Sequence, residues 1–402
     1  MRPPGTPGFV GCRLREAREA RNLTGVALAD VLGVTRQAVS QYEKGHQSPA
    51  PNVMRRISEV LRLPLHRFLR PVSEQPVGTI HYRSLKSSAK SFRTRAERRY
   101  GWLKEIVTYL RLFVKFPEVR FPDFEVPKNP EELSDPIIED LASQTRRFWG
   151  LGDGPISNTL WLLENNGAII VRHELFANKL DAFSEWSTGD STPYIVLGSD
   201  KASAVRSRFD LAHELAHVVL HRPVQTRLHE NSPLYKEMEA QAHRFAGAFL
   251  FPERSFASEF INGSLDSFLA LKAKWRVSVQ AMIRRASHLG LISEKREKQL
   301  WINLTSRGWK TSEPLDDTLE PEQPRFLKRS FDLITESGLV PKHQIPFELA
   351  MHSKDIEELI GLSSGYFDES PPVAELRSEK DEIPKNDSKE NFILRFPTQQ
   401  EG

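Results

Sequence analysis

A single apolar stretch, FDLAHELAHVVLH at residues 209–221, contains histidines and a glutamate whose spacing could bind and use a metal ion. His213 and His217 are four residues apart, so on a helix both imidazoles lie on one face and could hold the same cation. Glu214 would then lie beside a water on that metal and could act as general base. Zinc suits this set, because it accepts neutral nitrogen and carboxylate ligands and a catalytic site leaves one position for water.

Two histidines do not complete a zinc site, so a third ligand has to come from elsewhere in the chain. The segment YKEMEAQAHRFAGAFLFP, residues 235–252, is predicted to be a second helix with several carboxylates. Glu239 on this helix could be that ligand, with His243 four residues later supporting it. Manganese is an alternative to zinc for such ligands. A buried helix whose histidines simply bond neighbouring carboxylates is the competing interpretation.

The composition is that of a multidomain globular protein whose metal ligands must be histidine and carboxylate. The chain has 402 residues, of which 39% are hydrophobic and 27% charged, and this size predicts two to four domains. Its one cysteine, Cys12, excludes an intramolecular disulfide and a cysteine-rich zinc finger. The N-terminal segment lacks the apolar core of a signal peptide, and no apolar run is long enough to span a bilayer. We therefore expect a cytoplasmic protein with no membrane partner.

The elements that must position the metal ligands are predicted to form an α+β domain. Three short runs rich in branched and aromatic residues, at 165–175, 180–188 and 192–198, predict a small antiparallel sheet directly before the histidine-bearing helix. Residues 136–164 and 233–305 are predicted to be mainly helical. A small helical C-terminal region is expected at 306–370, and the charged, apolar-poor tail at 371–402 is predicted to be disordered.

The metal-binding segments resemble the ImmA/IrrE family of gluzincin-like metallopeptidases. The resemblance rests on HELAHVVLH, on EMEAQAHRFAGAFLFP, and on the preceding YIVLGSDKASAVRSRFD, and it covers about residues 150–255. The family has an acidic ligand six residues before a Phe-Ala pair. Here that pair is Phe245 and Ala246, which places the ligand on Glu239.

This resemblance implies a zinc peptidase with an assignable site. His213, His217 and Glu239 would hold the metal, and Glu214 would move protons during peptide hydrolysis. The family often has asparagine where His243 stands, so a supporting role for His243 does not follow from the resemblance. Four further cationic side chains are candidates for stabilising an oxyanion, and the sequence assigns none of them: Arg206, Arg208, His221 and His229.

Residues 9–70 predict a bundle of short helices with a helix-turn-helix at its centre. The helix predicted within LTGVALADVLGV ends at Gly33. The helix predicted within TRQAVSQYEKG begins at the N-cap Thr35 and ends at Gly45. The stretch resembles the Xre-type helix-turn-helix of the phage-repressor kind, which puts Arg36, Gln37 and Gln41 at major-groove positions. Glutamine can bond adenine and arginine guanine. The predicted DNA-facing residues are Thr35, Arg36, Gln37, Ser40, Gln41 and Lys44.

Charge is distributed unevenly along the chain. Residues 1–116 have a formal charge of +14 and the remainder −11, which favours contact of the N-terminal part with a double-stranded DNA operator. A basic helix at 83–104 could touch phosphate or could be a solvated linker face; its arginines are Arg93, Arg95, Arg98 and Arg99. The predicted divisions are 1–72 for the DNA-binding domain, 73–135 for a linker, 136–305 for the peptidase domain, 306–370 and 371–402.

Together the two resemblances imply a transcriptional regulator that carries a zinc-dependent endopeptidase. Such a protein would relieve repression by cutting a repressor or a related helix-turn-helix protein. Modules of this kind dimerise on paired half-sites, so a homodimer is expected. The alternative is a DNA-binding regulator whose peptidase-like domain is a non-catalytic sensor or an antitoxin-like module.

Overall fold

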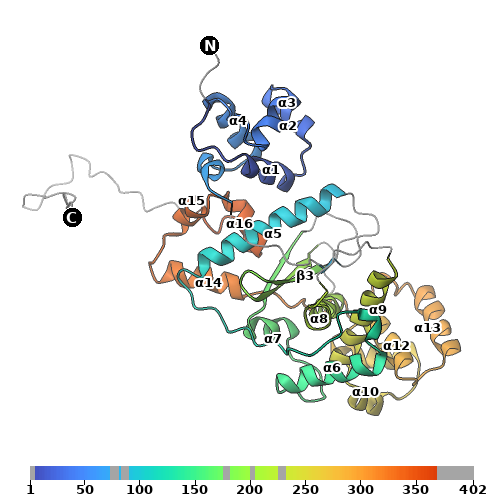
Figure 1. Cartoon of the computed structure of the whole chain (residues 1–402). Coiled ribbons are helices and arrows are strands. Elements are labelled where there is room, and N and C mark those ends of the chain that lie inside the picture. Colours follow the sequence, from blue (N-terminus) through green and yellow to red (C-terminus); the bar gives the residue numbers. More distant parts are fainter. Residues whose placement is uncertain are drawn as a thin grey trace, which may run out of the picture.

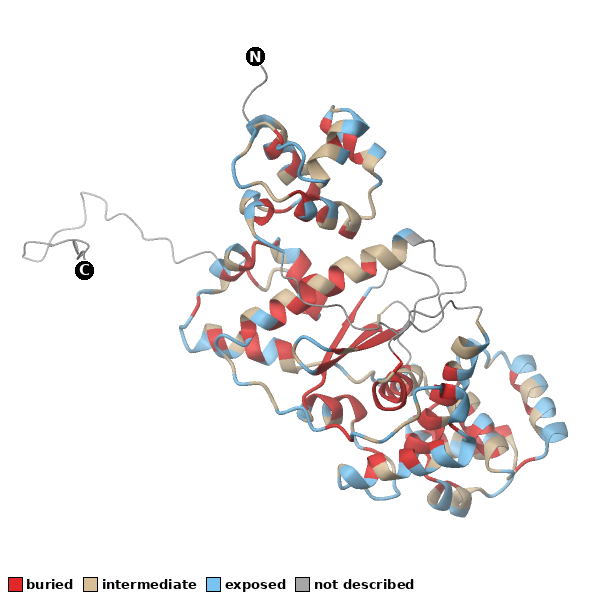
Figure 2. Cartoon of the chain, viewed as in Figure 1, coloured by how far each residue is buried: buried red, intermediate tan, exposed pale blue. Residues whose placement is uncertain are grey.

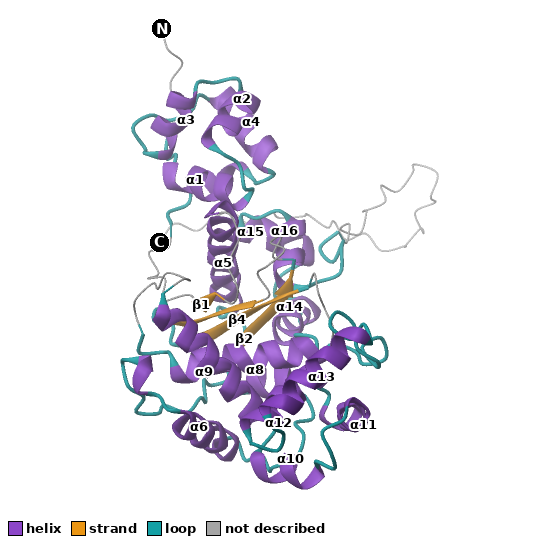
Figure 3. Ribbon diagram, turned by 90° about the vertical axis from the view of Figure 1, so that its right-hand side faces the viewer, coloured by secondary structure: helices purple, strands orange, loops and turns teal. Residues whose placement is uncertain are grey.

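The computed structural model describes residues 5–72, 81–82, 90–174, 182–199, 204–224 and 232–368. The tail at 371–402, predicted to be disordered, lies outside these residues. The described chain is arranged in three tiers: a helical head, a middle tier containing a sheet, and a lower group of helices (Figure 1). It is mainly helical with one small sheet (Figure 3), as the predicted fold class requires.

The head is a bundle of short helices whose ends follow from local chemistry. The Thr35 hydroxyl accepts a hydrogen bond from the first turn of α3, which is the predicted N-cap, and the Thr24 hydroxyl caps α2 in the same way. Gly33 ends α2 in the left-handed conformation, with φ of 60°. The elements are α1 Gly11–Ala20, α2 Gly25–Leu32, α3 Arg36–Glu43, α4 Pro51–Leu61 and the 3-10 helix η1 Leu65–Leu69.

The sheet is mixed, so the prediction of a wholly antiparallel sheet is wrong. Its strands, in spatial order, are β1 His81–Tyr82, β3 Ala182–Ser187, β4 Thr192–Gly198 and β2 Ile169–His173. β3 and β4 form an antiparallel hairpin, but β2 pairs with β4 in parallel. The four-residue link between β3 and β4 is short enough to form a hairpin, whereas β2 pairs with the other edge of β4.

Alternate side chains of the sheet enter two different cores, because helices cover both of its faces. One face packs with α5 (Lys90–Leu110) and the C-terminal helices, in a core that continues into the head, and contributes Ile169, Val171, Phe183, Tyr194 and Val196. The other packs with α8 (Ala204–Leu220) and contributes Ile170, Ala182, Ile195 and Leu197. The strands are accordingly buried on both sides (Figure 2).

Helix α8, Ala204–Leu220, runs through the middle of the molecule beneath the sheet and is buried from residue 211 to 220. Helix α9, Pro233–Leu250, lies beside it. The surrounding elements are η2 Pro130–Glu132, α6 Asp135–Phe148, α7 Thr159–Asn165, α10 Glu253–Glu259, α11 Leu265–Trp275, α12 Val279–His288 and α13 Glu294–Ser306.

Helix α5, Lys90–Leu110, and the C-terminal helices cover the upper face of the sheet. The region at 306–370 is helical as predicted, but it shares one core with α5 and the head. Its elements are α14 Phe326–Glu336, η3 Lys342–Gln344, α15 Ile345–Leu349 and α16 Ser353–Ile360. None of the helices in the described ranges is long and apolar enough to cross a membrane.

Candidate metal centre and nucleic-acid interface

The structure brings the three predicted metal ligands together between α8 and α9. The Nε2 atoms of His213 and His217 lie 3.1 Å apart. The Glu239 carboxylate lies 3.5 Å from His213 Nε2 and 3.3 Å from His217 Nε2. A tetrahedral zinc with bonds of about 2.1 Å separates neighbouring ligand atoms by roughly 3.4 Å. The three spacings therefore fit one divalent cation, and both imidazoles are buried.

Electrostatics at Glu239 also favour cation binding. Burial alone would raise the pKa of this carboxyl, but in the metal-free site, when His213 and His217 are protonated, their hydrogen bonds and charges outweigh burial and hold the pKa well below its usual range. Glu239 is thus ionised, which is the form that ligates a metal.

A buried hydrogen-bond chain sets the tautomer of His217. The side-chain amide of Gln241 donates to the Pro130 carbonyl at 2.6 Å, so its Oε1 accepts from His221 Nε2 at 3.0 Å. The His221 Nδ1 is then an acceptor, and the His217 Nδ1–H donates a hydrogen bond to it at 2.8 Å. This assignment leaves the His217 Nε2 lone pair facing Glu239 and His213, as a metal ligand requires.

Glu214 is fully buried and is oriented by the sheet. Its Oε2 accepts a hydrogen bond of 2.6 Å from the Ser184 hydroxyl on β3. No sequence pattern indicates Ser184, because the contact depends on how β3 packs over α8. Gln241 was missed for the same reason; the four-residue spacing of His217 and His221 was the only hint of the chain that it anchors.

His243 lies beside His213 at the candidate metal centre. Its ring lies 4.6 Å from that of His213 and stacks with Phe209 at 5.8 Å, measured between centroids. Support of Glu239 by His243 stays a prediction.

The cationic side chains left unassigned by the sequence make structural contacts. Arg208 is buried, donates to the Ile156 carbonyl at 2.8 Å and forms an ion pair with Glu322. Arg206 donates to the carbonyls of Lys310 and Thr311. Both arginines therefore hold the segment that follows α13. His229 lies outside the described residues.

The predicted DNA-facing residues lie on an accessible side of α3. Val39 points into the head's core, whereas five of the six predicted residues are exposed and Gln41, 3.2 Å from His46, is half-buried. The head faces the rest of the molecule through α1 and η1, and α3 lies on the side away from α5 (Figure 1). A DNA major groove could therefore approach α3.

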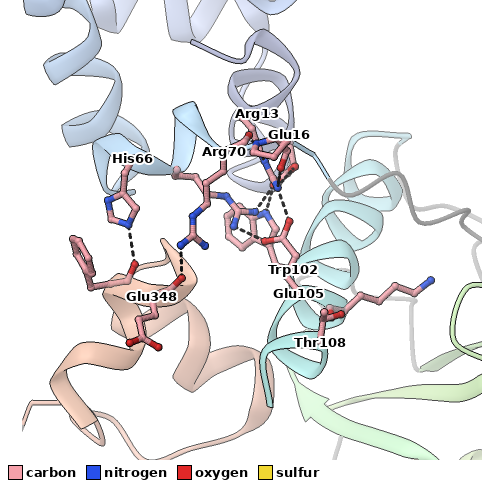
Figure 4. A network of polar contacts seen from close by, with 12 residues as sticks. Arg13, Glu16, His66, Arg70, Trp102, Glu105, Thr108 and Glu348 are labelled. Carbon is pink, nitrogen blue, oxygen red and sulfur yellow. Dashed lines mark hydrogen bonds and ion pairs between the residues drawn. The ribbon is translucent and has the colours of Figure 1, made fainter. Parts of the chain in front are cut away.

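An ion-pair network fastens the head to α5 (Figure 4). Arg13 and Arg67 each reach Glu105 of α5 at 2.5 Å, and Arg67 also reaches Glu16 at 2.6 Å. The Trp102 indole of α5 donates to Glu16 at 2.5 Å. Both guanidinium groups are buried, with 4% and 1% of the side chain exposed. The head is thus docked by buried charges that compensate one another.

The head also contacts the C-terminal helices. Arg21 pairs with Asp355 of α16 at 2.5 Å. Arg70 donates to the Glu348 carbonyl, and His66 lies 2.8 Å from the Phe347 carbonyl (Figure 4). The head therefore contacts helices that lie about 280 residues later in the chain.

The basic helix is not the solvated linker face that was one alternative. Arg98 pairs with Glu19 of the head at 2.7 Å, and the buried Arg99 pairs with Glu358 of α16 at 3.0 Å. Arg93 and Arg95 are half-buried. Much of this positive charge meets acidic side chains within the protein.

The fold and site define a helix-turn-helix domain joined to a domain with an HExxH helix and a nearby glutamate. Comparison with known proteins agrees. Residues 164–287 match the peptidase family model described as the IrrE N-terminal-like domain, and residues 14–68 match a helix-turn-helix family model.

One curated relative is similar over a short stretch. It is described as an uncharacterized HTH-type transcriptional regulator of Sinorhizobium fredii, and it is 34% identical over 62 residues. The match covers 15% of this chain and 43% of the relative, so the chain spans less than half of that protein's length.

Proposed function

We propose that this protein is a DNA-binding transcriptional regulator that carries a zinc-dependent endopeptidase. The observation that carries the proposal is the convergence of His213, His217 and Glu239 at spacings of 3.1–3.5 Å, with Glu214 next to the first ligand in sequence. The similarity to the IrrE N-terminal-like peptidase model supports it. Manganese is the other metal that this ligand set could take.

The chemistry divides between the metal and the chain. A bound zinc would polarise a peptide carbonyl and lower the pKa of water in the site. Glu214 accepts a proton from the attacking water and passes it to the leaving amine nitrogen. Ser184 holds one oxygen of that carboxylate, and the Gln241–His221 chain keeps a lone pair of His217 available to the metal.

We infer that the substrate is a repressor or a related helix-turn-helix protein, and that cutting it relieves repression. The head would bind an operator through α3, as a homodimer on paired half-sites. The support is the presence of a helix-turn-helix match and a peptidase-like match in one chain.

The test is incubation of the zinc-loaded protein with candidate repressors, beside Glu214→Gln. The expected result is cleavage by the wild type only, with equal metal in both proteins by elemental analysis. Equal metal with no Glu214-dependent cleavage would contradict the peptidase and favour the sensor. The complete burial of Glu214 is the observation that keeps the sensor as the second candidate. Elemental analysis also separates zinc from manganese.

A further inference from the structure

A separate cavity opens beside the metal centre. It has a volume of about 570 Å³ and lies between α8, α9, α12 and α13, within the usual size range of ligand pockets. Phe209, one helical turn before His213, forms part of its wall. His243 lines it as well and lies against the His213 ring. The cavity thus adjoins the candidate metal site, but the proposed hydrolysis does not use it.

The polar lining of the cavity is mainly cationic. Three arginines and two histidines face one carboxylate, that of Asp210; the cationic or titratable residues are Arg206, Arg284, Arg285, His243 and His288. The carbonyls that Arg206 contacts do not neutralise its charge. Arg284 pairs with Glu297 at 3.0 Å but is 57% exposed, and such pairs exchange partners at little cost.

The charge around His288 agrees with a positive potential in the cavity. Burial lowers the pKa of this imidazole, and the nearby Arg244, Arg284 and Arg285 lower it further, against an opposing effect of Glu139. Arg285 is itself fixed by two contacts with Glu139, at 2.6 and 2.9 Å. Arg285 is therefore a fixed part of the cavity lining.

The rest of the lining is apolar. Phe209, Ala281 and Trp301 supply flat or small surfaces, and the Arg284 guanidinium lies 5.6 Å from the centre of the Trp301 ring. Gly247 lies inside α9, where glycine costs stability relative to alanine. A Cβ there would meet Arg285 Cδ at 3.6 Å, an ordinary contact. Alanine would therefore fit at this position, whereas leucine would fill part of the cavity.

We propose that this cavity binds an anion, a carboxylate or phosphate attached to an apolar or aromatic body, next to the metal centre. The anion contacts Arg206 and Arg284, and its apolar part lies against Phe209 and Trp301. Such a group could be an acidic residue of a peptide or a free small molecule. The two sources have the same recognition chemistry and different consequences, because the first sets substrate preference and the second makes the domain a sensor.

Binding is tested with the full-length Glu214→Gln protein, so that no turnover intervenes. The probes are phenyl phosphate and two blocked tetrapeptides, acetyl-Ala-Phe-Glu-Ala-amide and its Gln counterpart, followed by calorimetry. We expect Arg284→Gln to weaken binding at least about tenfold, because a charge-assisted hydrogen bond is lost. Gly247→Leu should abolish binding, and Gly247→Ala should preserve the fold.

Arg307→Gln is a matched control. Arg307 is also an exposed arginine, pairs with Asp266 at 2.7 Å and lies 5.1 Å from the centre of the Trp309 ring, but it does not line the cavity. Its substitution should leave binding unchanged.

Preference for the Glu peptide assigns the site to a protein substrate, and binding of phenyl phosphate without that preference assigns it to a free ligand. The proposal is overturned if neither anion binds at up to about 10 mM, or if Arg284→Gln and Arg307→Gln behave alike. Neither result depends on cleavage, so a failure of the peptidase would be seen separately.

Discussion

Replacing Glu105 by alanine tests whether the buried ion pairs hold the head on α5. Glu105 accepts from Arg13 and Arg67 at 2.5 Å, and its own side chain is 23% exposed. Without it, two buried guanidinium groups share the single carboxylate of Glu16. Breaking a buried pair costs roughly 3–5 kcal/mol. Because Glu16 remains and Glu105 is partly hydrated, we expect the low end, about 3 kcal/mol.

Hydrogen exchange measures this change locally. A loss of about 3 kcal/mol corresponds to a rise on the order of 100-fold in the opening of the docked surfaces, and amides of α1 and η1 should exchange faster by that factor. The buried helix α8 provides an internal reference that should not change. Glu358→Ala is the matched control, because Glu358 pairs with Arg99 of the same helix but is 53% exposed. For this variant we expect the exchange rates of the same amides to rise less than about fivefold. A rise below fivefold for Glu105→Ala would refute the idea that this network docks the head.

Three further predictions address the site, the fold and the DNA interface. Gln241→Leu should weaken zinc binding about 10–100-fold in a chelator competition while leaving the fold intact, because the tautomer of His217 is no longer fixed; unchanged affinity would contradict the hydrogen-bond chain. Burial raises the pKa of Glu164 to about 7 from 4.5, so the stability it confers is present below pH 4.5 and is lost as the pH rises through 7. Between pH 5 and pH 8, the free energy of unfolding in urea should fall by up to about 3 kcal/mol more for the wild type than for Glu164→Gln. Equal falls for the two proteins would contradict the raised pKa. Gln37→Ala should weaken binding to a selected operator by about 1–3 kcal/mol and relax preference at one base, whereas an equal loss on all sequences in a mobility-shift assay would indicate phosphate contact.

The convergence of the three candidate metal ligands was predictable because it depends on local periodicity. His213 and His217 are one helical turn apart, and an acidic residue on the next helix needed only that α8 and α9 pack together. The orienting groups were not predictable in this way. Ser184 reaches Glu214 from a strand thirty residues earlier, and Gln241 is anchored by a carbonyl 111 residues away.

The sheet order and the fate of the basic helix depend on long-range packing as well. Strand β2 alternates normally, and nothing in its own residues specifies β4 as its partner. The arginines of α5 look solvated in sequence because their acidic partners lie far along the chain, as with Arg99 and Glu358, 259 residues apart. The sequence shows the positive charge of α5 but not which acidic side chains pair with it in the folded protein.

The contact of the head with α15 and α16 has a consequence for synthesis. The underside of the head is covered in part by α15 and α16, which leave the ribosome after nearly all of the other described elements. A product terminated before residue 345 would carry a folded head whose Arg21 and Arg70 lack the Asp355 and Glu348 contacts. Only a chain that extends through α16 can complete this arrangement, so the docking of the head on the rest of the protein depends on synthesis of helices about 280 residues later in the chain.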